Sequence, residues 1–259
     1  MNFATRRYGR FLLLAMLLPF SSGCATVSTA QGEPGNPRDP WENWNRNVFA
    51  FNDALDTHLL VPVATVYDDI TPHFVRLGVQ NFFNNFADAW SAVNNALQGK
   101  LERTFTDVVR VGTNTVLGFG GLFDIAGEAG IEPTFEDFGQ TLGHWGFAPG
   151  PYVVWPLFGP SSVRESFALP LDFAAGPSWS IHDENVRWGL AALRIVDVRA
   201  GLLGASKFLD GTGLDKYSFV RDAYLQRRRN LVFDGDPPDE PSPAEPAEPE
   251  TPQPDSKTK

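Results

Sequence analysis

A stretch of 26 residues without Asp, Glu, Lys or Arg, residues 138–163, restricts what this chain can fold into. About 20 apolar residues suffice to cross a bilayer, but this stretch contains five Gly and four Pro. Each Pro removes a backbone donor, and an irregular backbone facing hydrocarbon leaves polar groups unsatisfied. We therefore interpret the stretch as an irregular, Gly/Pro-rich aromatic hairpin. Two placements stay open: a connection over an ordinary core, or a segment at a membrane interface.

The N-terminus resembles a bacterial lipoprotein signal. Residues 1–23 contain three Arg followed by a short apolar run, which is typical of a signal peptide. Cys24 is the only cysteine of the chain and follows Gly directly, although Ser21 stands where Leu is usual. We predict lipid attachment at Cys24, which would anchor the chain firmly if several acyl chains are added. The alternative is an ordinary signal peptide with an incidental cysteine.

Charge excludes one class of partner. The net charge is −10, and without the Arg residues of 1–23 the remaining chain is near −13. An acidic protein lacks the basic footprint that nucleic acid requires, and anionic lipid would not hold it by bulk charge. Residues 234–259 carry −6 and are rich in Pro, so we predict a disordered acidic tail. The tail is either simply solvated or a docking segment.

Apolar periodicity predicts one mainly all-α domain over residues 39–233, preceded by a polar tether over 24–38. Asp39 and Glu42 form a capping-box pattern at the start of the first helix, and Pro62 is expected to interrupt the helical segment that follows. The expected helices cover residues 40–59, 72–98, 102–117, 122–129, 135–142, 161–169, 184–203 and 215–233, with a single strand at 152–155.

Asn residues are frequent within the apolar helices, although Asn is a poor helix former. They include Asn81, Asn84, Asn85 and Asn114. Two interpretations remain: caps and solvated faces, or a polar lining of a water-filled space inside an apolar shell. Three consecutive Arg at 227–229 either complement the dipole of the last helix or contact phospholipid headgroups or an acidic partner.

No enzymatic signature is recognisable. The four His are not spaced as metal ligands on one helix face, and neither a G-x-S-x-G elbow nor a phosphate-binding loop is found. A hydrolase built from Ser161 or Ser162 with His144 and Asp137 can be imagined, but nothing in the sequence orients it. We therefore expect neither catalysis nor a metal or cofactor.

Short blocks of residues throughout the domain form a distinctive pattern. They are Asp39-Pro40-Trp41-Glu42, Asn45-Arg46, Phe51-Asn52, Val75-Arg76, Asn81-Phe82, Leu97-Gln98-Gly99, Arg110, Asn114-Thr115, GFGGLFD at 118–124, EDFGQTLGHWG at 136–146, Gly150-Pro151-Tyr152, Gly159-Pro160-Ser161 and RDAYLQRR at 221–228. With these blocks the chain resembles the MlaA/VacJ family of outer-membrane lipoproteins. The blocks keep one collinear order from about 39 to 235, which makes the resemblance specific.

The resemblance implies a ring of helices in the inner leaflet of the Gram-negative outer membrane, lipid-anchored at the periplasmic face. Residue Ala25, which is not Asp, implies sorting to that membrane. Mislocalised phospholipid would pass through a polar-lined channel to a periplasmic lipid-carrier protein, and some members sit beside trimeric porins. A structural scaffold without transport and a phospholipase are the alternatives.

The resemblance also suggests site residues. The candidate channel or headgroup contacts are Asn81, Asn84, Asn85, Asn114 and Arg110. The candidate gating hairpin contains Gly143, Trp145, Gly146, Gly150 and Tyr152.

Overall fold

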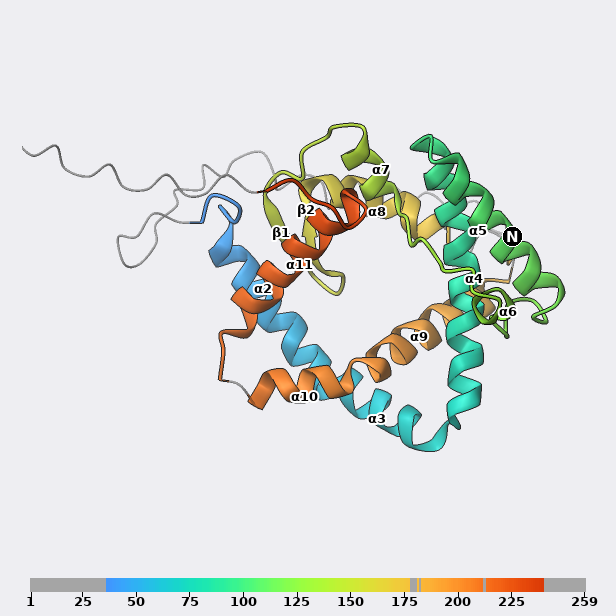
Figure 1. Ribbon diagram of the computed structural model, residues 1–259. Coiled ribbons are helices and arrows are strands. Elements are labelled where there is room, and N and C mark those ends of the chain that lie inside the picture. The colour runs from blue at the N-terminus through green and yellow to red at the C-terminus, as the bar shows by residue number, and fades with distance from the viewer. Residues whose placement is uncertain (1–35, 178–180, 182, 212, 240–259) are drawn as a thin grey trace, which may run out of the picture. The chain divides into compact units, whose positions relative to one another are not determined.

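The computed structural model describes residues 36–239 except 178–180, 182 and 212, and these residues are mostly helical (Figure 1). The mainly α fold class is thereby confirmed. The predicted signal peptide, Cys24, the tether up to residue 35 and the tail from residue 240 lie outside the described residues. The elements are α2 (Glu42–Leu55), η2 (Asp56–Leu60), α3 (Val61–Ile70), α4 (His73–Leu97), α5 (Leu101–Val116), α6 (Ile125–Glu128), α7 (Phe138–His144), β1 (Tyr152–Trp155), β2 (Gly159–Ser162), α8 (Val163–Ala174), α9 (Glu184–Gly201), α10 (Leu203–Gly211) and α11 (Lys216–Val232).

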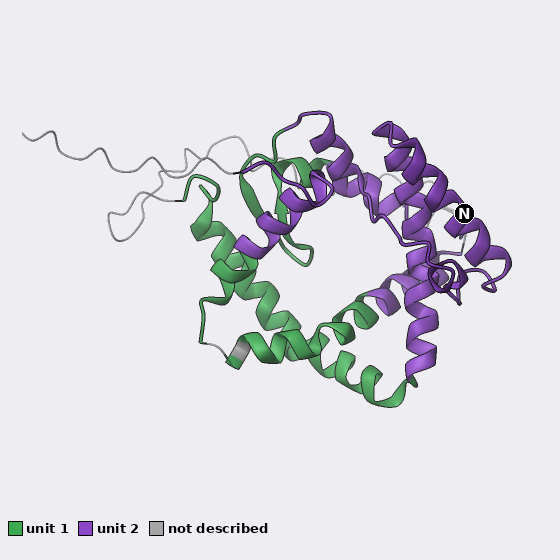
Figure 2. Cartoon of the chain, in the orientation of Figure 1, with its two compact units in different colours: residues 1–72, 148–167, 195–221 green, residues 73–147, 168–194, 222–259 purple. Residues whose placement is uncertain are grey.

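The chain divides into two compact units (Figure 2). Unit 1 takes its described residues from 1–72, 148–167 and 195–221, and unit 2 from 73–147, 168–194 and 222–259. We describe each unit by itself. The ring arrangement and the single-domain boundaries 39–233 therefore stay predictions.

In unit 1, the helical path continues through Pro62 instead of breaking there. The five residues of η2 form a π-helical turn directly before α3, and the backbone N–H of Val61 donates to the carbonyl of Asp56. Pro62 lies in the first turn of α3, where the missing backbone N–H is tolerated. The wider π turn thus lets the helical path continue through a residue that the sequence analysis treated as an interruption.

Asp39 does not cap α2, so the predicted capping box is wrong. The residue before α2 is Trp41, with no side-chain capping bond. Asp39 is buried instead, where it accepts hydrogen bonds from Asn45 Nδ2 at 2.7 Å and from the hydroxyl of Tyr217. Glu42 pairs with Arg46 one helical turn along, at 2.7 Å. Buried donors 6 and 178 residues away in sequence therefore outcompete the local cap.

The aromatic stretch contains a two-stranded antiparallel hairpin in unit 1. The predicted strand β1 is present, and it pairs with β2 in a register that places Val154 opposite Pro160. The sequence analysis missed β2 because Gly, Pro and Ser are poor strand formers. As a consequence α8 starts at Val163 instead of residue 161. The hairpin is well buried along β1, where Tyr152 and Val154 are fully inaccessible.

Asn45 joins α2 to the hairpin. Its amide donates to Asp39 and to the carbonyl of Tyr152 at 3.1 Å, and its Oδ1 accepts from the backbone N–H of Val154 at 2.8 Å. The side chain is fully buried. One amide group therefore satisfies both a carboxylate and the hairpin backbone.

Unit 2 is built on α4 and α5, with the short helices α6 and α7 following in sequence. The long helix α4 spans 25 residues and ends at Leu97, shortly before Gly99 as predicted. The two short helices are displaced from their predicted ranges, because their caps are Asp124 and Asp137: these side chains accept hydrogen bonds from the N–H groups of Gly127 and Gln140. Side-chain capping fixes these starts more strongly than apolar periodicity.

We expect Asn45→Ala to lower the free energy of unfolding by about 2–3 kcal/mol, because it leaves buried hydrogen-bonding groups of the hairpin unsatisfied. Urea unfolding of the protein in detergent micelles, followed by circular dichroism, measures the change. Asn47→Ala is the matched control, since Asn47 is exposed on the same helix. Equal destabilisation by the two substitutions would contradict this assignment.

Candidate functional site: a polar core beneath an apolar surface

Polar side chains of unit 2 recur along α4 and α5 at helical spacing and are buried. On α4 they follow steps of three and four residues, and on α5 they repeat in the same way. The buried polar residues are Asn85, Asp88, Ser91, Asn94, Asn95, Asp107, Arg110 and Asn114. Each helix thus turns a polar stripe toward the protein interior.

Several large apolar side chains of the same helices are exposed, although Phe83 on α4 is buried. On α5 they are Leu101, Phe105, Val108 and Val116, of which Val116 is 78% exposed. Helix α4 likewise exposes Phe74, Leu77, Val93 and Leu97. A helix of a water-soluble protein normally has the opposite arrangement, and large exposed apolar patches mark contact with a membrane or a partner. In the described parts of the chain, every helix is too short or too polar to cross a membrane.

Arg110 lies at the centre of the polar core. Its Nε donates to Asp88 at 3.0 Å, its Nη2 pairs with Asp124 at 3.1 Å, and its Nη1 donates to the carbonyl of Ile131. The side chain is only 2% exposed. A single guanidinium therefore holds together α4, α5 and the segment around α6.

Asn114 continues this core toward the loop after α5. Its Nδ2 donates to Asp124 at 2.9 Å, and its Oδ1 accepts from the backbone N–H of Ala126. The loop then passes against Asn85, where a Cβ added to Gly121 would lie 2.7 Å from the Asn85 Cβ. Gly121 also has φ +90°, so only glycine fits there.

Asn95 and Asp107 form the other end of the core. Asn95 Nδ2 and the hydroxyl of Thr134 each donate to the same oxygen of Asp107 at 2.8 Å. The Oδ1 atoms of Asn85, Asp88, Asn95 and Asp107 have no protein partner among the described residues. Burial raises the pKa of Asp107, although Thr134 and Asn95 oppose this shift. The core thus holds more acceptors than donors.

The predicted headgroup contacts fall into two groups. Arg110, Asn114 and Asn85 are at most 8% exposed and bind protein groups. Asn84 is exposed, and Asn81 is half-buried with its amide donating to the carbonyl of Leu122 at 3.2 Å. Contact of any of them with lipid stays a prediction.

The predicted gating residues are divided between the units. Gly143, Trp145 and Gly146 belong to unit 2, where the indole of Trp145 donates to the carbonyl of Leu97 at 3.1 Å. Gly150 and Tyr152 belong to unit 1 and lead into β1. Their role as a gate stays a prediction.

The acids of the core, Asp88, Asp107 and Asp124, were not among the predicted site residues. Asp88 was detectable, because a carboxylate among aromatic and small residues of a long apolar helix requires a buried partner. Asp124 is the last residue of the GFGGLFD block, and its side chain caps α6 by accepting from the backbone N–H of Gly127, three residues further on. No three His, Cys, Asp or Glu side chains within the described ranges are grouped to hold a metal ion.

Asp88 generates a prediction on pH. Burial raises the pKa of Asp88 from 3.8 to about 6, although Arg110 opposes the shift. Because the folded state then holds this proton more tightly than the unfolded chain, the stabilising contribution is complete below about pH 4 and is lost as pH rises through about 6. We expect the free energy of unfolding of the wild type, relative to Asp88→Asn, to fall by roughly 1–3 kcal/mol from pH 4 to pH 7.

Urea unfolding of both proteins at the two pH values measures that difference. Asp69→Asn, at an exposed position of α3, is the control for the removal of one carboxylate. A pH-independent difference for Asp88→Asn would contradict the assignment.

Comparison with known proteins identifies the family. The family model described as "MlaA lipoprotein" matches residues 37–231. The chain is 34% identical over 235 residues to "Intermembrane phospholipid transport system lipoprotein MlaA" of Escherichia coli (strain K12), covering 88% of this chain and 90% of that protein. It is 37% identical over 195 residues to an uncharacterized protein of Rickettsia felis, covering 75% and 78%.

A solved structure is similar as well. It is described as "Structural basis for maintenance of bacterial outer membrane lipid asymmetry" and aligns with a TM-score of 0.65 at 36% identity, covering 75% of this chain and 98% of that one. With a family match across most of the chain and relatives above 30% identity over most of their length, this chain belongs to the MlaA lipoprotein family.

Proposed function

We propose that this protein is the outer-membrane lipoprotein of a retrograde phospholipid transport system. It is anchored through Cys24 at the periplasmic face of the outer membrane. It takes mislocalised phospholipid from the outer leaflet through a polar-lined channel and passes it to a periplasmic lipid-carrier protein. A trimeric porin is a further partner.

The observation that carries the proposal is the inverted amphipathicity of α4 and α5. Apolar side chains on the outside of unit 2 suit a hydrocarbon environment, because burying them in lipid is favourable at about 25 cal/mol per Å². The buried polar groups hold these helices in place beside a polar path for a charged headgroup, which hydrocarbon alone would exclude. Family membership with lipoproteins of phospholipid transport supports the same reading.

Within this proposal, the five polar candidates have different roles. Asn84 and Asn81 are the ones that a headgroup reaches in the described conformation, since Asn84 is exposed and Asn81 half-buried. Arg110, Asn114 and Asn85 instead hold the walls in place through their contacts with protein groups.

Transport without catalysis fits the surroundings of the two serines. Ser162 is 1% exposed and lies directly before α8. Its hydroxyl donates to the carboxylate of Glu165, and its oxygen accepts from the backbone N–H of Glu165 at 3.5 Å, as an N-cap residue does. Ser161 is also buried, and its hydroxyl lies 3.1 Å from that of Ser166. A phospholipase would release fatty acid from phospholipid in vitro and lose that activity with Ser161→Ala or Ser162→Ala.

Outer-leaflet phospholipid in cells lacking this gene tests the proposal. We expect accumulation that the wild-type gene reverses and Cys24→Ala does not, because the unanchored protein leaves the membrane. Rescue by both the wild-type and the Cys24→Ala gene would support transport and would show that lipid attachment at Cys24 is not required for it. Absence of accumulation would overturn the proposal in favour of a structural scaffold.

Gating by the aromatic stretch is tested at Gly146, which has φ +93° and open space around its Cβ position. We expect Gly146→Val to raise outer-leaflet phospholipid measurably while the protein remains folded, because the substitution strains the backbone there. Gly130→Val is the matched control: Gly130 has φ +81° and equally open surroundings. Gating would be refuted by unchanged asymmetry at wild-type protein levels, or by an equal effect of both variants.

A further inference from the structure

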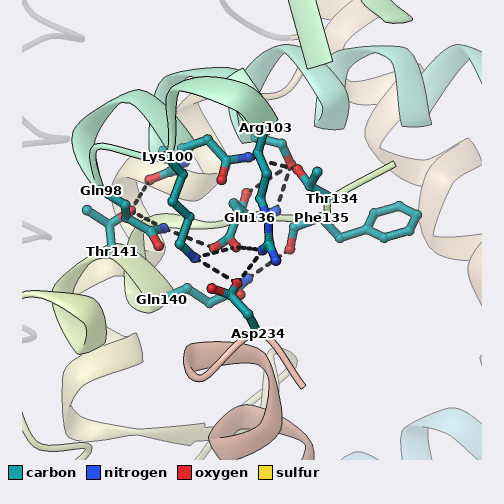
Figure 3. A network of polar contacts seen from close by, with 12 residues as sticks. Gln98, Lys100, Arg103, Thr134, Phe135, Glu136, Gln140, Thr141 and Asp234 are labelled. Carbon is teal, nitrogen blue, oxygen red and sulfur yellow. Dashed lines mark hydrogen bonds and ion pairs between the residues drawn. The ribbon is translucent and has the colours of Figure 1, made fainter. Parts of the chain in front are cut away.

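Two cations and two carboxylates meet in unit 2 where three helices end or begin (Figure 3). Lys100 lies between the end of α4 and the start of α5, and Asp234 follows α11. Lys100 Nζ is 2.7 Å from Asp234 and 3.3 Å from Glu136. Arg103 also pairs with Asp234, and its Nη1 lies 3.8 Å from Glu136. Two cations thus face two carboxylates.

The two carboxylates are held very differently. The side chain of Glu136 is 2% exposed, and it also accepts a hydrogen bond from Gln98 at 3.0 Å. The side chain of Asp234 is 28% exposed, and its carboxylate's partners among the described residues are Lys100 and Arg103. Glu136 is therefore a fixed part of the core, whereas Asp234 can leave without breaking other contacts.

The backbone at Asp234 does not require an acid. Asp234 has φ +55°, and the next N–H, that of Gly235, donates to the carbonyl of Asn230 at 2.9 Å. This is a helix C-terminal motif in which glycine usually takes the left-handed position, and an L residue there costs roughly 1 kcal/mol or more. The side chain at this position is thus explained by its contact with the cations.

Exposed apolar side chains lie close to the cationic pair in sequence. Leu101 is 74% exposed and Phe105 is 69% exposed on the first turns of α5. Phe135, directly before Glu136, is 52% exposed and has φ +54°, an outlier for an aromatic residue. In Figure 3 its ring points away from the polar contacts. An anion with apolar chains attached matches this combination of surfaces.

We propose that Lys100 and Arg103 bind the phosphodiester of a phospholipid, and that the carboxylate of Asp234 occupies this site when lipid is absent. The acyl chains lie over Leu101 and Phe105. This inference rests on the proposed function and names a lipid site within it.

Replacing the Asp234 carboxylate by a lipid phosphodiester leaves the net charge at Lys100 and Arg103 unchanged, because each of the two groups carries one negative charge. Glu136 remains paired in both states. Arg presents several donors to phosphate oxygens in a fixed fork, and Arg103 is 41% exposed, so an incoming headgroup reaches it. Asp234 lies beyond the residues that the family model matches, which end at 231.

Binding of phosphatidylglycerol in mixed detergent micelles, titrated by calorimetry with the full chain, tests the site. We expect Asp234→Asn to tighten binding about 3- to 10-fold, because the competing carboxylate is removed and Asn tolerates the left-handed backbone. Asp236→Asn changes the charge equally two residues away and should leave affinity unchanged. Arg103→Gln should weaken binding about 10-fold or more, as expected for loss of a charge-assisted contact.

Lys100→Gln alone would leave the buried Glu136 without its closest cation, so Lys100→Gln/Glu136→Gln is used to keep the fold. We expect it to weaken lipid binding as Arg103→Gln does. Equal affinities of the Asp234→Asn and Asp236→Asn variants, or wild-type binding by Arg103→Gln, would overturn the lipid site while leaving transport intact. Displacement of the lipid by micromolar inorganic phosphate would show that Lys100 and Arg103 bind free phosphate instead of a phospholipid. A wild-type protein that binds no phospholipid would overturn the proposed function itself.

Discussion

The buried ion pair between Arg110 and its two carboxylates is the interaction on which unit 2 depends. The guanidinium contacts Asp88 on α4, Asp124 at the cap of α6 and the carbonyl of Ile131. Removing one partner from a buried pair leaves a charge uncompensated, at a cost of about 3–5 kcal/mol. Because Arg110 and the Asn residues bind groups within the polar stripes of α4 and α5, the opposite faces of these helices are free to be apolar.

This arrangement places two kinds of surface within a few residues of each other. The interior offers amide and carboxylate groups, and the exterior offers aromatic and aliphatic side chains such as Phe105 and Val116. A phospholipid has the same two parts, and a protein that moves it must contact both. Lys100 and Arg103 pair with Asp234, and Leu101 and Phe135, the sequence neighbours of Lys100 and Glu136, are exposed. Unit 1 is stabilised differently, by the contacts of Asn45 and Asp39 with the hairpin and α11.

Much of the fold was predictable, and the errors have physical causes. Helical periodicity located α4, α5, α9 and α11 to within a few residues, because long amphipathic patterns repeat many times. The strand β2 was missed because Pro160 and its neighbours have no strand preference, and β1 alone pairs them. Asn114 and Arg110 were chosen as site residues, whereas their carboxylate partner Asp124 was not, since the contact depends on the loop between α5 and α6.

The sequence by itself determined that the chain is mainly helical and that it resembles MlaA lipoproteins, and the lipoprotein signal at residues 1–23 stays a prediction from the sequence. Only the tertiary structure decided which face of each helix is buried. Periodicity identifies an apolar face and a polar face, but it contains no information on which medium covers each of them. Likewise Asp39 and Asp234 look like a local cap and the start of a tail, and their burial or pairing depends on residues more than 100 positions away. Such contacts form only when distant segments pack together, so a local sequence pattern does not predict them.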